Sequence, residues 1–170
     1  FLDVTDDTGT GYKGLVVGAA LADVDGDMYP DLWLAPLTDG SAMLRKNEGG
    51  ISFRDVTEEA GLIPVDRGFT TWVLDYNQDG HQDIFLGTFY AQMTLQLRGL
   101  SGYPTKDAHP ALFRNNGDGT FKEVAFESGL VRALSSMGCN YADLDNNSFP
   151  DLYIGTGFPS FEGMIPNTLY

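Results

Sequence analysis

The strongest constraint in this sequence is a nine-residue acidic pattern that occurs three times. The second copy, from Asp75 to Asp83, has oxygen-bearing side chains at positions 1, 3, 5 and 9 and a glycine at position 6. Ca²⁺ takes about six to eight oxygen ligands, and alternating carboxylates on one tight turn can supply most of them. The pattern therefore predicts a calcium cage in each loop. The candidate ligands at positions 1, 3, 5 and 9 are Asp23, Asp25, Asp27 and Asp31, then Asp75, Asn77, Asp79 and Asp83, then Asp143, Asp145, Asn147 and Asp151.

The three copies differ at position 6, where the turn is sharpest. The second copy has Gly80 there, whereas the first has Met28 and the third has Ser148. Residues other than glycine tolerate a positive φ poorly. We therefore expect the second loop to bind calcium best and the other two to be distorted or weaker.

Two alternatives compete with a calcium cage. An EF-hand shares the opening spacing, but it needs flanking helices and a bidentate glutamate at position 12. This chain has Leu34, Leu86 and Ile154 at that position, so an EF-hand is excluded. Ordinary solvated turns also favour Asp, Asn and Gly. Three copies in register, each ending in an aspartate followed by an apolar segment, favour cages over such turns.

A second motif sets the length of the repeat. Residues 1–5, 53–57 and 121–125 are versions of one phenylalanine-led segment, and each begins at the same distance before an acidic loop. We therefore divide the chain, as one partial β-propeller over residues 1–170, into repeats 1–52, 53–120 and 121–170. Periods in this range are typical of propellers and other repeat arrays. The extra length of the second repeat falls after Asp83 and predicts an insertion there.

Each repeat contains short apolar segments separated by turn residues, which favours strands. The acidic loop is expected to close a hairpin, and a tight turn at 116–119 is expected to join a third strand to a fourth. Four short antiparallel strands per repeat are typical of a propeller blade. The sequence thus predicts an all-β fold of β-propeller blades. The chain is expected to begin in one blade's outer strand and to end in another blade's third.

Composition narrows the function classes. The net charge is −14 and the pI is about 4.2, which argues against a nucleic-acid partner because no basic surface is available for phosphates. No apolar run approaches the length of a membrane span. The single cysteine, Cys139, cannot form an internal disulfide and is expected to be a buried thiol. The sequence contains no catalytic motif, and we expect a protein that is not an enzyme.

The motifs F-x-D-V-T, D-x-D-x-D-G-x-x-D-L and L-F-R-N-N-G-D-G-T-F together resemble the FG-GAP/VCBS-type repeat of integrin α-subunit propellers. The resemblance is greatest to proteins of the cartilage-acidic-protein (ASPIC and UnbV-like) type. It implies a seven-bladed propeller that is extracellular, at the cell surface or periplasmic, with up to three Ca²⁺ between the first and second strands of the blades. It also implies the backbone carbonyls of Tyr29, His81 and Phe149 as further ligands. A structural or adhesive role is implied far more than catalysis.

Two function classes stay open. The favoured one is a calcium-stabilised module that presents loops to a protein or glycan partner, and the alternative is a non-catalytic propeller domain or accessory subunit of a larger enzyme or complex. A partner is expected at the loops around 88–110 and 156–166, whose apolar side chains could instead form a small satellite core. Because propellers typically close with about four to eight blades, we also expect further blades or partner subunits.

Overall fold

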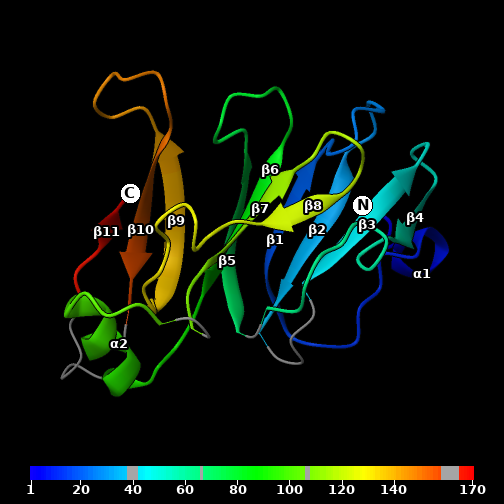
Figure 1. Ribbon diagram of the computed structural model, residues 1–170. Coiled ribbons are helices and arrows are strands. Elements are labelled where there is room, and N and C mark those ends of the chain that lie inside the picture. The colour runs from blue at the N-terminus through cyan, green and yellow to red at the C-terminus, as the bar shows by residue number, and fades with distance from the viewer. Residues whose placement is uncertain (38–41, 66, 106–107, 158–164) are drawn as a thin grey trace.

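The computed structural model describes residues 1–37, 42–65, 67–105, 108–157 and 165–170, and its strands form three antiparallel sheets that lie side by side (Figure 1). The first sheet contains β1 (Val16–Ala22), β2 (Asp31–Pro36), β3 (Met43–Glu48) and β4 (Ser52–Asp55). The second contains β5 (Gly68–Leu74), β6 (Asp83–Thr88), β7 (Ala111–Asn115) and β8 (Phe121–Glu123). The third contains β9 (Ser136–Ala142), β10 (Asp151–Thr156) and β11 (Thr168–Leu169). The predicted all-β fold of propeller-like blades is confirmed, and the three sheets do not close into a ring.

The acidic loops close the first hairpin of every sheet, as predicted. In the first sheet, β1 leads into the loop and β2 begins at its last aspartate, so that Ala22 pairs with Asp31. The matching pairs in the other sheets are Leu74 with Asp83 and Ala142 with Asp151. Each loop therefore continues directly into a strand that contributes buried apolar side chains to the core, and the packing of that strand holds the last aspartate in place.

The larger core lies between the first and second sheets. Trp33 of β2 packs edge-on against Phe113 of β7, with ring centroids 5.9 Å apart. The indole N–H of Trp33 donates a hydrogen bond of 2.9 Å to Thr71 Oγ1 on β5. Ile84 and Leu86 of β6 belong to the same core. Aromatic and aliphatic burial of this kind is the main force that holds two blades together.

A second core lies between the second and third sheets. Successive side chains of a strand point to opposite faces, so Phe85 of β6 packs away from Ile84 and Leu86 and meets Leu152 and Ile154 of β10. All residues of β6 are buried for this reason. The middle sheet is covered on both faces by its neighbours.

Cys139 of β9 is a free, half-buried thiol beside the second core. Its Sγ lies 3.3 Å from Thr70 Oγ1. Burial raises the pKa of the thiol to about 11, so the neutral form predominates near pH 7. The residue packs as a small hydrophobic group.

Among the described residues, no element covers the face of the third sheet that points away from the second. Tyr153 and Leu169 pair across β10 and β11, and both side chains are exposed. Apolar side chains on an open face favour a covering element. A further blade or a partner subunit over this face remains a prediction.

The outer strand expected at residues 1–5 does not form. Instead α1 (Thr5–Thr8) begins there, and Phe1 is fully exposed. The prediction was wrong because a strand needs a hydrogen-bonding neighbour, and β3 is already paired with β2 and β4. The segment is held on β3 by Arg45, whose guanidinium donates to the carbonyls of Gly9 and Gly11. The equivalent motifs at 53–57 and 121–125 do contribute strands, β4 and β8.

The predicted insertion follows β6 and contains α2 (Met93–Leu100), which lies below the third sheet in Figure 1. Gln96 of this helix is buried, and its Nε2 donates to Tyr90 O at 2.7 Å and to Ser135 Oγ at 3.1 Å. No helix in the described part of the chain is long and apolar enough to cross a membrane. The insertion is thus anchored to the blade by buried polar contacts as well as by packing.

Candidate metal centres

The first aspartate of each acidic loop shapes the turn by accepting backbone N–H groups with both carboxylate oxygens. Asp23 Oδ1 accepts from Gly26 at 2.8 Å and from Asp27 at 3.1 Å, and Asp23 Oδ2 accepts from Met28 at 2.9 Å. The matching bonds, between 2.9 and 3.1 Å, join Asp79 and Gly80 N–H to Asp75, and Asn147 and Ser148 N–H to Asp143. The three loops therefore share one hydrogen-bond pattern.

The backbone is left-handed at positions 4 and 6 of every loop. At position 6 the φ angle is 72° for Met28, 89° for Gly80 and 76° for Ser148. At position 4 the left-handed residues are Gly26, Gln78 and Asn146. The first and third loops thus keep the shape of the second without the turn glycine, so the expected distortion is absent and the cost appears as backbone strain.

Relief of that strain is directly testable. We expect Met28→Gly and Ser148→Gly each to raise the free energy of unfolding by about 1 kcal/mol, because a left-handed residue with a Cβ costs about 1–2 kcal/mol. Gly80→Ala is the matched reverse change: a Cβ there meets no atom within 4 Å, so only the φ angle is penalised. Urea unfolding in EDTA measures all three, and a loss of stability in both glycine variants would contradict the strain argument.

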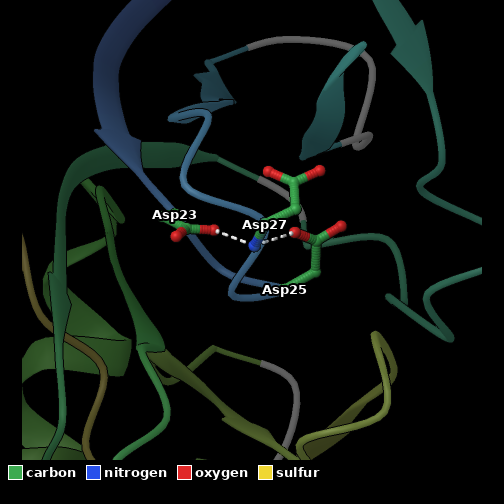
Figure 2. Close-up of side chains that lie close together, drawn as sticks. All are labelled: Asp23, Asp25 and Asp27. Atoms are coloured by element: carbon green, nitrogen blue, oxygen red, sulfur yellow. Dashed lines mark hydrogen bonds between the residues drawn. The ribbon is translucent and has the colours of Figure 1, made fainter. Parts of the chain in front are cut away.

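The side chains at positions 3 and 5 accept the backbone N–H two residues further on. Asp25 Oδ1 accepts from Asp27 at 3.2 Å, and Asp27 Oδ1 accepts from Tyr29 at 3.0 Å. In Figure 2 the Asp27 N–H lies between the carboxylates of Asp23 and Asp25. The Tyr29 N–H, and then the Lys46 ammonium, hold the pKa of Asp27 below its usual value. The Asp27 carboxyl group is thereby kept ionised, and the hydrogen bonds orient the side chains of Asp25 and Asp27.

Position 9 is buried in the first two loops, unlike the other ligand positions, and half-buried in the third. Asp83 has no exposed surface, and its two oxygens accept from Tyr76 N–H at 3.1 Å and from Asn115 N–H at 2.8 Å. Asp31 accepts from two backbone N–H groups in the same way. Burial raises the pKa of Asp83 to about 6, and it also raises the pKa of Asp31. A bound dication would favour the ionised form of both carboxyl groups.

Clusters of three carboxylates form in two of the loops. One oxygen from each of Asp23, Asp25 and Asp27 lies within 4.8 Å of the others, and the same holds for Asp143, Asp145 and Asp151. The second loop makes no such cluster within the described residues, and there Asn77 Nδ2 donates to Asp79 Oδ2 at 2.8 Å. Its candidate amide ligand is Asn77 Oδ1.

A lysine reaches the first loop from β3. Lys46 Nζ contacts the carboxylate of Asp25, and it lies 3.1 Å from Asp27 Oδ2. These hydrogen bonds raise the pKa of Lys46. The ammonium therefore already neutralises part of the charge that a metal ion would neutralise.

The donor set fits a hard cation. All candidate side-chain ligands offer oxygen, the ligand type that Ca²⁺ and Mg²⁺ prefer and that Zn²⁺ and copper sites rarely use alone. Carboxylates held this close repel one another unless a cation lies between them. Asp, Asn and backbone groups on a flexible turn suit the larger Ca²⁺ better than the strictly octahedral Mg²⁺. The carbonyls of Tyr29, His81 and Phe149 remain predicted ligands.

The strand 3 to strand 4 turns lie against the acidic loops, as expected from the alternation of turns in a blade. A Cβ added at Gly117 would approach His81 Nε2 to 2.5 Å, and one at Gly50 would approach the ring of Tyr29 to 3.6 Å. The His81 ring therefore packs directly against Gly117 in the β7–β8 turn. A larger residue at position 117 would collide with this ring.

Two asparagines at the ends of third strands escaped the sequence reasoning, although both support the loops. Asn47 and Asn115 stand at the same place in β3 and β7, and each donates its N–H to a position 9 aspartate at 2.8 Å. The sequence places an asparagine before the strand 3 to strand 4 turn in both repeats. Asparagine is also common in ordinary turns, so its sequence position alone does not predict the hydrogen bond to the aspartate.

A known family model matches the part of the chain that contains the first two acidic loops. Residues 23–86 match the FG-GAP-like repeat. The match begins at the first ligand of the first loop and ends in β6, so it covers the first two acidic loops and strands β2 to β5 between them. No curated protein matches the chain. The FG-GAP-like repeat supports a β-propeller-like module of the interaction type, and the finer resemblance to the ASPIC and UnbV-like type stays a prediction.

Proposed function

We propose that this chain is a calcium-binding segment of a β-propeller that acts as a non-catalytic interaction module. The observation that carries the proposal is the shared geometry of the three loops. In each of them a position 1 aspartate holds the turn through the same backbone hydrogen bonds, and in the first and third loops three carboxylate oxygens lie within 4.8 Å of one another. The FG-GAP-like repeat at residues 23–86 supports the same function.

Bound calcium would stabilise the blades as well as the loops. Each loop joins the first two strands of a sheet, and its last aspartate hydrogen-bonds to the third strand in the first two sheets. A cation that holds this aspartate ionised and fixed therefore ties three strands together. We place the protein outside the cytoplasm, at the cell surface, secreted or periplasmic, because extracellular calcium modules of this kind work at about 10⁻⁴ to 10⁻³ M.

The insertion offers the surface for a protein or glycan partner. Leu95 packs with Tyr90, Ala108 and Ala133 in a small cluster, which supports the satellite-core alternative for part of the insertion. Leu97, Leu100 and Tyr103, however, remain exposed on or beside α2. Apolar and aromatic side chains grouped on a rigid element are typical of interaction surfaces. The second predicted loop, 156–166, lies mostly outside the described residues.

Calorimetric titration of the metal-free chain with CaCl₂ tests the proposal. We expect three sites, with one site lost in each of Asp27→Ala, Asp79→Ala and Asp145→Ala. Asp118→Ala is the matched control, because Asp118 is an exposed aspartate in the β7–β8 turn, outside the acidic loops, and its carboxylate accepts from Thr120. No heat of binding, or loss of a site in the control alone, would refute the proposal.

The position of Lys46 predicts a weaker first loop. Lys46→Met should raise the calcium affinity of that loop about five- to tenfold, because the metal no longer competes with an ammonium for Asp25 and Asp27. Lys122→Met is the control, since Lys122 pairs with the exposed Glu127. An unchanged affinity in Lys46→Met, measured in the Asp79→Ala and Asp145→Ala background, would show that the ammonium does not compete.

A further inference from the structure

A buried hydrogen-bond chain links the first two acidic loops across the boundary between their sheets. Asp31 Oδ2 accepts from Val24 N–H at 3.1 Å, and Val24 O accepts from Asn115 Nδ2 at 2.7 Å. Asn115 N–H in turn donates to Asp83 Oδ1 at 2.8 Å. All four residues are buried, with exposed fractions of 8% or less. The two position 9 aspartates are therefore connected by three direct bonds.

Asn115 uses its backbone N–H and both polar atoms of its side-chain amide. Besides Val24 and Asp83, its side chain donates to Gln82 O at 3.1 Å and accepts from Gly117 N–H at 2.9 Å. A buried polar group with all its partners fixed has one allowed orientation, since any other leaves a costly unpaired donor or acceptor. The rotamer of the Asn115 side chain therefore depends on the positions of both the first and the second acidic loop.

Asn47 provides an internal comparison in the first sheet. Its N–H donates to Asp31 Oδ1 at 2.8 Å, its Nδ2 donates to Pro30 O at 2.9 Å, and its Oδ1 accepts from Gly50 N–H at 2.7 Å. These are the bonds that Asn115 makes within its own sheet. The bond from Asn115 to Val24 is the additional one, and it is the bond that crosses to the neighbouring sheet.

We propose that Asn115 is a positioning residue that couples the first two calcium loops, so that a cation in either loop raises the affinity of the other. The proposal rests on calcium binding by the loops. A cation in the first loop fixes Asp31 and with it Val24, whose carbonyl fixes the Asn115 side chain. Asn115 then holds Asp83 in place before the second loop is filled. Binding of the second cation then costs less conformational entropy. The increase in affinity is reciprocal between the two loops by thermodynamic linkage.

Site-resolved titration tests the coupling. In an Asp145→Ala background, which disables the third loop, the affinity of the first loop is measured with the second loop intact and with it disabled by Asp79→Ala. We expect the intact second loop to raise the affinity at least threefold. In Asn115→Ala the ratio should fall to about one, whereas in Asn47→Ala it should remain. A ratio that survives Asn115→Ala, or that is lost equally in Asn47→Ala, would overturn the proposal.

A second measurement leaves Asn115 unchanged and so does not depend on the folding of its variant. With Asp79→Ala and Asp145→Ala together, calcium can fill only the first loop. Amide hydrogen exchange at Asn115 and Tyr76, the two donors to Asp83, should then slow at least threefold relative to Leu144, the matching donor to Asp151. Equal slowing, or none, would overturn the coupling. Absence of calcium binding in every loop would instead refute the proposed function, so the two failures are distinguishable.

Discussion

We expect chelation of calcium to lower the thermal midpoint of this protein by roughly 5 to 10 °C for each loop that calcium occupies. A ligand that binds only the folded state stabilises it by about 2.7 kcal/mol at a hundredfold excess over Kd. For a chain of this size, each kcal/mol shifts the midpoint by roughly 2–4 °C. The measurement is a melting curve followed by circular dichroism in millimolar CaCl₂ and in EDTA.

The triple variant Asp27→Ala, Asp79→Ala, Asp145→Ala is the control for this effect. It removes one ligand from each loop while the position 1 aspartates that shape the turns are kept. Its midpoint should be the same in CaCl₂ and in EDTA. An equal shift in the triple variant would assign the stabilisation to calcium bound elsewhere, and no shift in the unmodified chain would contradict the account.

Asp83→Ala destabilises the metal-free protein by about 3–5 kcal/mol. The reason is local: Tyr76 N–H and Asn115 N–H donate to this carboxylate inside the protein, and each buried donor left without a partner costs about 1–3 kcal/mol. Removal of the side chain also leaves a cavity beside β6. Urea unfolding in EDTA measures the loss without any contribution from metal binding.

Asp79→Ala separates the two roles of a loop aspartate. Asp79 is exposed, and its carboxylate accepts hydrogen bonds from the His81 backbone N–H and from the Asn77 side chain. Its removal should cost less than about 1 kcal/mol in EDTA but should abolish the calcium-dependent gain at the second loop. If both variants lose the same stability in EDTA, Asp83 is not the buried anchor that its contacts indicate.

The hairpins and the loops followed from sequence because their causes are local. A position 1 aspartate, a turn that needs a positive φ and an apolar strand after position 9 all act within one short segment. The same register in three copies predicts second strands directly after Asp31, Asp83 and Asp151, and in the structure each strand begins at that aspartate. Only the tolerance of Met28 and Ser148 for the left-handed backbone was misjudged, because the hydrogen bonds to Asp23 and Asp143 compensate for that strain.

The remaining features depend on partners far away in the sequence. Asn115 of the second sheet donates a hydrogen bond to Val24 in the first acidic loop. Lys46 of β3 contacts the carboxylates of the same loop. The first contact requires two sheets to pack together, and the second requires β3 to pair with β2. The outer strand expected at residues 1–5 failed for a related reason, since a strand motif specifies an element only when a neighbouring edge is available. Helix α2 and its buried Gln96 likewise depend on contacts with the segment before β9.

The most direct test of the calcium account is a crystal structure of the chain grown in CaCl₂, with diffraction data collected at a long wavelength to locate calcium by its anomalous signal. We expect one anomalous peak in each acidic loop, surrounded by the oxygens of positions 1, 3, 5 and 9 at about 2.3–2.6 Å, and Lys46 displaced from Asp25 and Asp27. Loops that show no anomalous peak at millimolar calcium, with Lys46 still paired to both carboxylates, would contradict it.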